Sequence, residues 1–151
     1  MKRAFLFALI LSIFLVSCAK QEIASEELEE KAVVLSMHKM VLEPLQSQDF
    51  FVGLKNELAE NVTFYISAVC KTNNCNNNII VQTFPQFALS AGKKGAFPIR
   101  VEVLENSQKG NYTVRIFVKE DNRTYDSDEF TVEVQKTIEE IKESALERIF
   151  K

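Results

Sequence analysis

The chain of 151 residues has no tryptophan, one histidine, four glycines, three prolines and three cysteines. Because His38 is the only histidine and no pair of carboxylates is spaced for acid–base catalysis, a nucleophile would lack a base, and we expect no enzyme activity. A blue-copper site needs two histidines and is excluded for the same reason. The sequence therefore predicts neither a catalytic site nor a cofactor.

The chain also lacks an excess of positive charge. The net charge is −3, and losing Lys2 and Arg3 with a leader peptide would leave −5. A nucleic-acid partner requires a basic stripe, so we expect none. Hydrophobic residues make up 46% of the chain and include twelve phenylalanines. This composition is typical of one globular domain with a phenylalanine core and short appendages.

The N-terminus carries an export signal. Lys2 and Arg3 precede an apolar run over residues 4–16, broken only by Ser12. At about 1.5 Å per residue the run spans ~20 Å, less than the ~30 Å hydrocarbon core, so it fits the leader of residues 1–17 better than a membrane span.

The four residues that end the leader are Leu15, Val16, Ser17 and Cys18. They resemble the lipobox of prokaryotic lipoproteins, which implies cleavage before Cys18 and a diacylglycerol on its thiol. The alternative is an ordinary signal peptide followed by a chance cysteine. Several acyl chains would anchor the chain stably on the outer face of the cell membrane or in the periplasm and outer membrane. Residues 18–32 are acidic and are interpreted as a solvated tether.

Residues 97–135 contain three runs in which apolar and polar side chains alternate, the pattern of half-buried strands. We predict three antiparallel strands there, which need a second layer to cover them. Further strands are predicted over residues 33–45, 49–56, 62–70 and 78–84. About seven short strands separated by turn signals indicate an all-β antiparallel sandwich over residues 33–135.

Three segments resemble the immunoglobulin-like modules of prokaryotic surface proteins: residues 51–56 (FVGLKN), 60–65 (ENVTFY) and 110–114 (GNYTV). The resemblance implies a tyrosine corner at Tyr112, whose hydroxyl would bond to the backbone nearby. Gln108 stands where an aspartate is usual, and the core tryptophan of antibody domains is absent. Members of this family serve in adhesion, display or carbohydrate contact, so the fold transfers and the function does not.

With Cys18 lipidated, Cys70 and Cys75 remain, and export places them in an oxidising compartment. We expect a disulfide that closes a small loop, worth about 2 kcal/mol in the chain-entropy description. A two-thiolate metal site is the alternative, and it has no further cysteine or nearby histidine.

Four other patterns each have a plainer interpretation. Met37, His38 and Met40 could hold Cu(I), but core methionines with a surface histidine explain them better. The acidic residues Glu120, Asp121, Asp126, Asp128 and Glu129 could bind Ca²⁺ at a hairpin end, but they lack EF-hand spacing and are interpreted as a solvated turn. The asparagines of residues 73–78 could bind sugars but suit a loop. Sequons begin at Asn61, Asn111 and Asn122 and matter only in a host that glycosylates them.

The last segment, residues 136–151, predicts an amphipathic helix that begins with a capping box at Thr137 and Glu140. In an immunoglobulin-like sandwich the strands over residues 62–70 and 111–119 are neighbours, so Tyr65, Val69 and Phe117 should point outward together. Either the C-terminal helix covers this apolar patch or a partner does.

Our first hypothesis is a lipid-anchored, non-catalytic module of the cell envelope that contacts a protein or a glycan. The alternatives are a metal- or small-ligand-binding lipoprotein that uses Met37, His38 and Met40 or the acidic hairpin, and an accessory domain of a surface hydrolase or transporter system.

Overall fold

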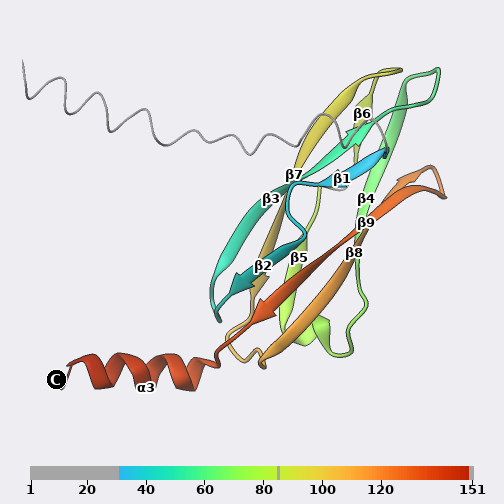
Figure 1. Ribbon diagram of the computed structural model, residues 1–151. Coiled ribbons are helices and arrows are strands. Elements are labelled where there is room, and N and C mark those ends of the chain that lie inside the picture. Colours follow the sequence, from blue (N-terminus) through green and yellow to red (C-terminus); the bar gives the residue numbers. More distant parts are fainter. Residues whose placement is uncertain (1–30, 85, 150–151) are drawn as a thin grey trace, which may run out of the picture.

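The computed structural model describes residues 31–84 and 86–149; the predicted leader, Cys18 and nearly all of the tether lie outside this range. Two sheets pack face to face (Figure 1). The first has the strand order β1–β3–β7–β5 and the second β2–β9–β8–β4–β6. The strands are β1 (Val33–Leu35), β2 (Lys39–Leu42), β3 (Ser47–Lys55), β4 (Val62–Cys70), β5 (Ile79–Gln82), β6 (Phe87–Leu89), β7 (Lys94–Val103), β8 (Gly110–Glu120) and β9 (Arg123–Val134).

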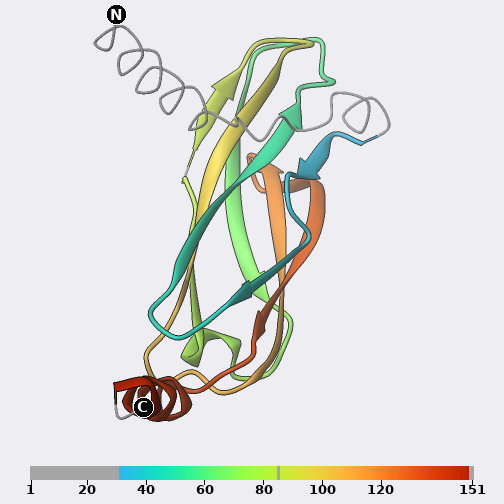
Figure 2. The ribbon, with the colours of Figure 1, turned by 60° about the vertical axis from the view of Figure 1, so that its left-hand side comes forward.

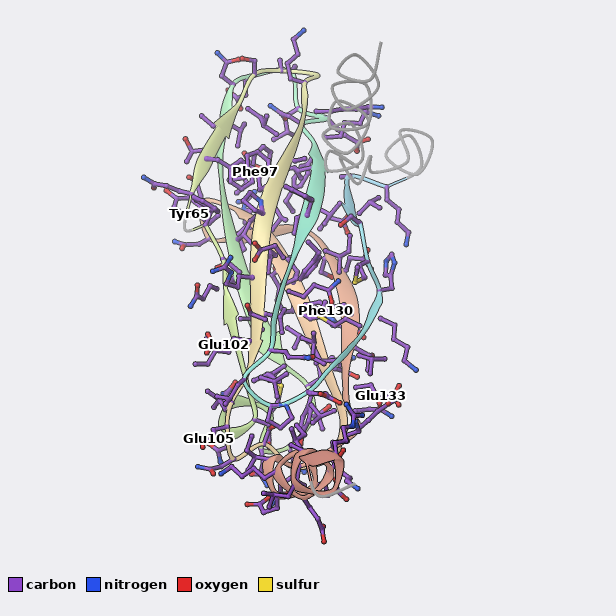
Figure 3. The ribbon with its side chains drawn as sticks, turned by 90° about the vertical axis from the view of Figure 1, so that its left-hand side faces the viewer. Tyr65, Phe97, Glu102, Glu105, Phe130 and Glu133 are labelled. Atoms are coloured by element: carbon purple, nitrogen blue, oxygen red, sulfur yellow. A yellow bond between two sulfur atoms is a disulfide. The ribbon has the colours of Figure 1, made fainter. Side chains whose placement is uncertain are left out.

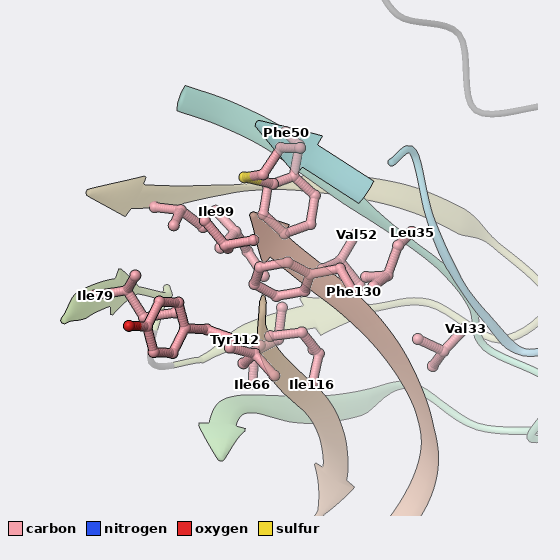
Figure 4. Close-up of a cluster of buried hydrophobic side chains, with 14 of the residues drawn as sticks. Val33, Leu35, Phe50, Val52, Ile66, Ile79, Ile99, Tyr112, Ile116 and Phe130 are labelled. Atoms are coloured by element: carbon pink, nitrogen blue, oxygen red, sulfur yellow. The ribbon is translucent and has the colours of Figure 1, made fainter. Parts of the chain in front are cut away.

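The core lies between the two sheets and is rich in phenylalanine and β-branched residues (Figure 4). Phe50 of β3 meets Phe130 of β9 edge-to-face across the sandwich, with ring centroids 4.8 Å apart. Alternation works as predicted on β8, where Tyr112, Val114, Ile116 and Val118 are all buried. Burial of these side chains is the main force that holds the sheets together.

The predicted single strand over residues 33–45 is wrong. The segment divides into β1, which pairs antiparallel with β3, and β2, which pairs parallel with β9 in the opposite sheet. The chain crosses between the sheets at Ser36, whose hydroxyl accepts a hydrogen bond from the Phe51 N–H at 2.9 Å. Apolar and polar residues do not alternate regularly in this segment because the chain changes sheet. The positions that point into the core follow one register before Ser36 and another after it.

The opposite edge has a similar crossing. β5 pairs with β7, and the chain then changes sheet so that β6 pairs with β4. The sandwich therefore has nine strands instead of seven, and the pairing of β2 with β9 is parallel. All four edge strands have three or four residues, which limits the unpaired backbone available for strand addition.

The stretch of residues 97–135 is not one sheet. β7 belongs to the first sheet, whereas β8 and β9 pair with each other in the second. The predicted solvated turn at Asp126–Glu129 is also wrong, since β9 already begins at Arg123. A bulge in the β8–β9 ladder lies opposite Val118 and Lys119. It lets Tyr125 pack against Phe64, with ring centroids 4.9 Å apart, at the end of the core.

Polar side chains fix the ends of the sandwich. The Tyr112 hydroxyl donates to the Gln108 carbonyl oxygen at 2.7 Å, which is the geometry expected of a tyrosine corner. Burial raises the pKa of this hydroxyl. Asn56 is fully buried, and its Nδ2 donates to the carbonyl oxygens of Glu60 (2.9 Å) and Leu89 (3.0 Å). These bonds close the connections at the two ends of the core.

Helix α3 (Ile138–Ile149) begins with the capping box: the Thr137 N–H donates to Glu140 Oε2 at 2.9 Å. The helix projects from the end of the sandwich where β8 begins and β9 ends, as Figures 1 and 2 both show. An ion pair between Lys109 and Glu140 fixes its first turn, with Nζ and Oε1 2.5 Å apart. No helix in the described residues is long and apolar enough to cross a membrane.

Candidate functional site

The outer face of the second sheet carries the predicted apolar patch, which we call the aromatic patch: Tyr65, Val69 and Phe117. β4 and β8 are antiparallel neighbours, as predicted, and Phe117 lies opposite Ser67, diagonally between Tyr65 and Val69. Phe64 and Ile116 point inward and are fully buried. Tyr65 is 39% exposed and Val69 49% exposed, and Figure 3 shows Tyr65 at the margin of the sandwich, away from Phe130 at its centre.

A charged rim borders the aromatic patch. Glu129 of β9 accepts hydrogen bonds from Lys71 Nζ at 2.8 Å and from the Arg115 guanidinium. Lys71 and Arg115 together hold the pKa of the Glu129 carboxyl below its ordinary value. The Arg115 guanidinium carbon also lies 5.8 Å from the centre of the Phe117 ring. Apolar side chains at the centre with charged groups around them are typical of a protein-binding surface.

Helix α3 does not cover the aromatic patch. It leaves the sandwich at the end where Lys109 lies and β8 begins, whereas Phe117 lies toward the other end of β8, opposite Ser67 of β4. Ile138 is buried against the sandwich, but Leu146, two turns later, is 55% exposed. Of the two predicted ways to cover the patch, the folded-back helix is thus contradicted by the position of α3.

The proposed copper ligands point in different directions. Met40 is buried in the core, whereas His38 is exposed and lies 3.0 Å from Asp128 through its Nε2 atom. Met37 Sδ accepts a hydrogen bond from Gln48 Nε2 at 3.4 Å. This placement matches the plainer interpretation of core methionines and a surface histidine.

The acidic residues predicted to form a hairpin end have separate protein partners. Asp126 Oδ2 accepts the Val33 N–H at 3.0 Å, and Asp128 Oδ2 accepts the Leu35 N–H at 3.2 Å. Glu129 is engaged by Lys71 and Arg115. Across the described residues, no group of three acidic, histidine or cysteine side chains is placed to hold a metal ion. Asp126 and Asp128 instead bind β1 to β9.

Cys70 and Cys75 form the predicted disulfide. In the loop it closes, Asn74 adopts a left-handed conformation with φ 59°, which asparagine tolerates well. Asn78 is buried, its Nδ2 donates to the Asn74 carbonyl oxygen at 2.7 Å, and its Oδ1 accepts the Gln108 N–H at 2.7 Å. Part of the asparagine cluster therefore serves the loop. The three sequon asparagines, Asn61, Asn111 and Asn122, are exposed.

A groove on the first sheet was not predicted from the sequence. Residues from β3, β7 and the end of β5 line it: Asp49, Gln82, Thr83, Phe84, Pro98, Ile99 and Arg100. The sequence feature that could have indicated the groove is the Phe84–Pro85 pair, which marks a turn after a strand. The exposure of Phe84 depends on β5 leaving its sheet at that point.

No family model and no curated protein matches this chain. Solved structures do. A FixG-related protein from Vibrio parahaemolyticus is 7% identical, with 61% of this chain and 82% of that chain covered and a TM-score of 0.50. The native conformation of Escherichia coli alpha-2-macroglobulin is 9% identical, with coverages of 68% and 6% and a TM-score of 0.52.

A family 123 glycoside hydrolase from Clostridium perfringens is 12% identical, with 66% of this chain and 23% of that chain covered and a TM-score of 0.50. This chain thus spans most of the first protein and under a quarter of the other two. At such low identity the likeness concerns the fold alone. Together with the two-sheet topology it establishes an immunoglobulin-like β-sandwich.

Proposed function

We propose that this chain is a lipid-anchored, non-catalytic module of the cell envelope whose aromatic patch binds a partner protein. The observation that carries the proposal is a pair of neighbouring strands with Tyr65 and Val69 exposed and Phe117 half-buried on their outer face, which α3 leaves uncovered. Isolated apolar side chains on a surface need no explanation, but adjacent aromatic ones on a flat sheet favour contact.

The anchor is supported by the lipobox of residues 15–18, which stands at the end of the apolar run. The tether of residues 18–32 has fifteen residues, so it reaches at most about 50 Å when fully extended. A sandwich held at that distance can meet proteins of the same membrane or of a neighbouring layer. Its partner would approach the aromatic patch with an apolar centre and would meet the charged rim of Lys71, Arg115 and Glu129, whose charges pair with one another.

Phe117→Asp is the direct test in the full-length protein. We expect loss of partner association by at least about tenfold, because a carboxylate would be buried at the centre of the contact. The melting temperature should change little, since Phe117 points away from the core. Envelope crosslinking followed by affinity purification measures the association, and light scattering measures self-association.

Val41→Asp is the matched control, because Val41 is an exposed apolar residue (49%) of β2 in the same sheet but outside the aromatic patch. We expect it to leave association unchanged. Equal association of wild type and Phe117→Asp would contradict the proposal. A large fall in melting temperature would show instead that Phe117 supports the fold rather than a contact.

A further inference from the structure

The groove belongs to the first sheet, whereas the aromatic patch lies on the outer face of the second. At the edge of the groove the Thr83 hydroxyl donates to the Ile66 carbonyl oxygen of β4 at 3.3 Å. The ladder between β5 and β7 ends at the pair Gln82–Arg100, and the chain then leaves to join the second sheet as β6. The departure leaves an open groove of about 420 Å³ beside β7. Its walls come from the end of β5, from β7 and from Asp49 of β3.

The backbone that faces this groove is unsuited to adding a strand. Phe51 exchanges both of its main-chain hydrogen bonds with Ser36: its N–H donates to the hydroxyl at 2.9 Å, and its carbonyl accepts the N–H at 2.9 Å. Its partner on β7, Pro98, is therefore in a non-hydrogen-bonded pair and turns its main chain toward the groove. Proline offers no N–H there, so an extended peptide would find no donor at this position.

The side chains of the groove combine one aromatic ring with planar polar groups. Phe84 is 54% exposed. The Arg100 guanidinium binds Asp49 through two parallel hydrogen bonds, Nε to Oδ1 at 2.7 Å and Nη2 to Oδ2 at 2.9 Å. This pair is half exposed, lowers the pKa of Asp49, and adds little to folding because water screens it. The second terminal nitrogen of Arg100 and the remaining lone pairs of Asp49 stay available to a ligand.

The charges of the groove favour an uncharged ligand rich in hydroxyl groups. Asp49 and Arg100 neutralise each other, and Gln82 and Thr83 carry no charge. A pyranose ring presents an apolar C–H face, which packs against an aromatic ring, and pairs of vicinal hydroxyls, which both donate and accept hydrogen bonds. A mostly apolar groove with a few polar groups at one side suits such a molecule.

We propose that this groove binds a neutral saccharide. The sugar ring packs on Phe84, with Pro98 at the floor. Two adjacent hydroxyls bridge the Asp49–Arg100 pair, one donating to the carboxylate and one accepting from the guanidinium. The site uses neither the lipid anchor nor the aromatic patch, so the module can hold a glycan on one face and a protein on the other.

The test is binding of the full-length protein, purified in mild detergent, to a printed array of bacterial-envelope and plant oligosaccharides. The strongest oligosaccharide is then titrated calorimetrically, with an expected Kd between about 10 µM and 1 mM. We expect Phe84→Ala to weaken binding at least about tenfold. Asp49→Asn, which keeps the shape and loses one acceptor, should weaken it by a similar factor.

Ile80→Ala is the matched control, because Ile80 is an exposed apolar residue (40%) of β5 that does not line the groove. We expect it to bind like wild type, and so should Phe117→Asp on the other face. No signal above the detergent-only control on any oligosaccharide would overturn the proposal. Binding that survives Phe84→Ala but is lost in Phe117→Asp would place the sugar on the aromatic patch instead, and would contradict the groove.

Discussion

Asp126→Asn combined with Asp128→Asn is expected to lower the free energy of unfolding by about 2–4 kcal/mol. Each carboxylate uses both oxygens. One accepts the N–H of the next residue, at 2.7 Å for Asp126 and 2.8 Å for Asp128, and the other accepts an N–H of β1. Asparagine has one acceptor oxygen, so in each variant the amide nitrogen faces one of the two N–H donors and one hydrogen bond is lost. The β1 donors concerned are the N–H groups of Val33 and Leu35. Both of these residues are buried, and water cannot replace the lost bond.

Urea unfolding measures the change, and hydrogen exchange localises it. The amides of Val33 and Leu35 should exchange much faster in the double variant, whereas those of β8 should follow global stability. Glu133→Gln serves as the control, since Glu133 is on the same strand but pairs with Lys39 at the surface. Unchanged exchange in β1 would mean that its ladder with β3 is sufficient to hold it.

Cys18→Ser is expected to abolish the processing and membrane anchoring that we propose for the full-length protein. Without the thiol no diacylglycerol can be attached, and the lipobox cannot direct cleavage before residue 18. We expect either an unprocessed precursor, heavier by residues 1–17, or a protein released from the membrane fraction. Fractionation after carbonate washing, together with intact-mass measurement, distinguishes these forms.

Ser17→Ala is the matched control for this change, because it keeps the cysteine and a small residue before it. It should leave anchoring intact. A Cys18→Ser protein that is cleaved at the same position and remains with the membrane would show that the leader is of another kind. The sandwich would then still fold, since Cys70 and Cys75 form the disulfide without Cys18.

The features predicted correctly from the sequence are local ones. β4 and β8 follow from strict alternation, because one face of each is buried and the other is not. The same alternation predicts that Tyr65, Val69 and Phe117 share one outer face. The resemblance to immunoglobulin-like modules implied that the Tyr112 hydroxyl bonds to the backbone nearby, and its acceptor is the Gln108 carbonyl oxygen. The Cys70–Cys75 disulfide was predicted because assigning Cys18 to the lipid leaves only these two cysteines to pair.

The features that were missed depend on contacts between distant residues. Residues 33–45 divide into two strands because β3 and β9, in different sheets, each pair with one part. Asp126 and Asp128 read as turn residues because charge usually marks solvent, yet they lie inside β9 and bind backbone more than ninety residues away. The groove exists only because β5 leaves β7 beside Pro98. No local pattern contains that information.

Site-specific photo-crosslinking in intact cells tests the central claim most directly. A photoreactive phenylalanine analogue replaces Tyr65 of the aromatic patch, and in a control replaces Ile80 on the opposite sheet. The account predicts a discrete crosslinked band with an envelope protein from position 65, lost when Phe117→Asp is added, and no such band from position 80. Equal crosslinking from both positions, or none from position 65, would contradict the assignment of this face as the binding surface.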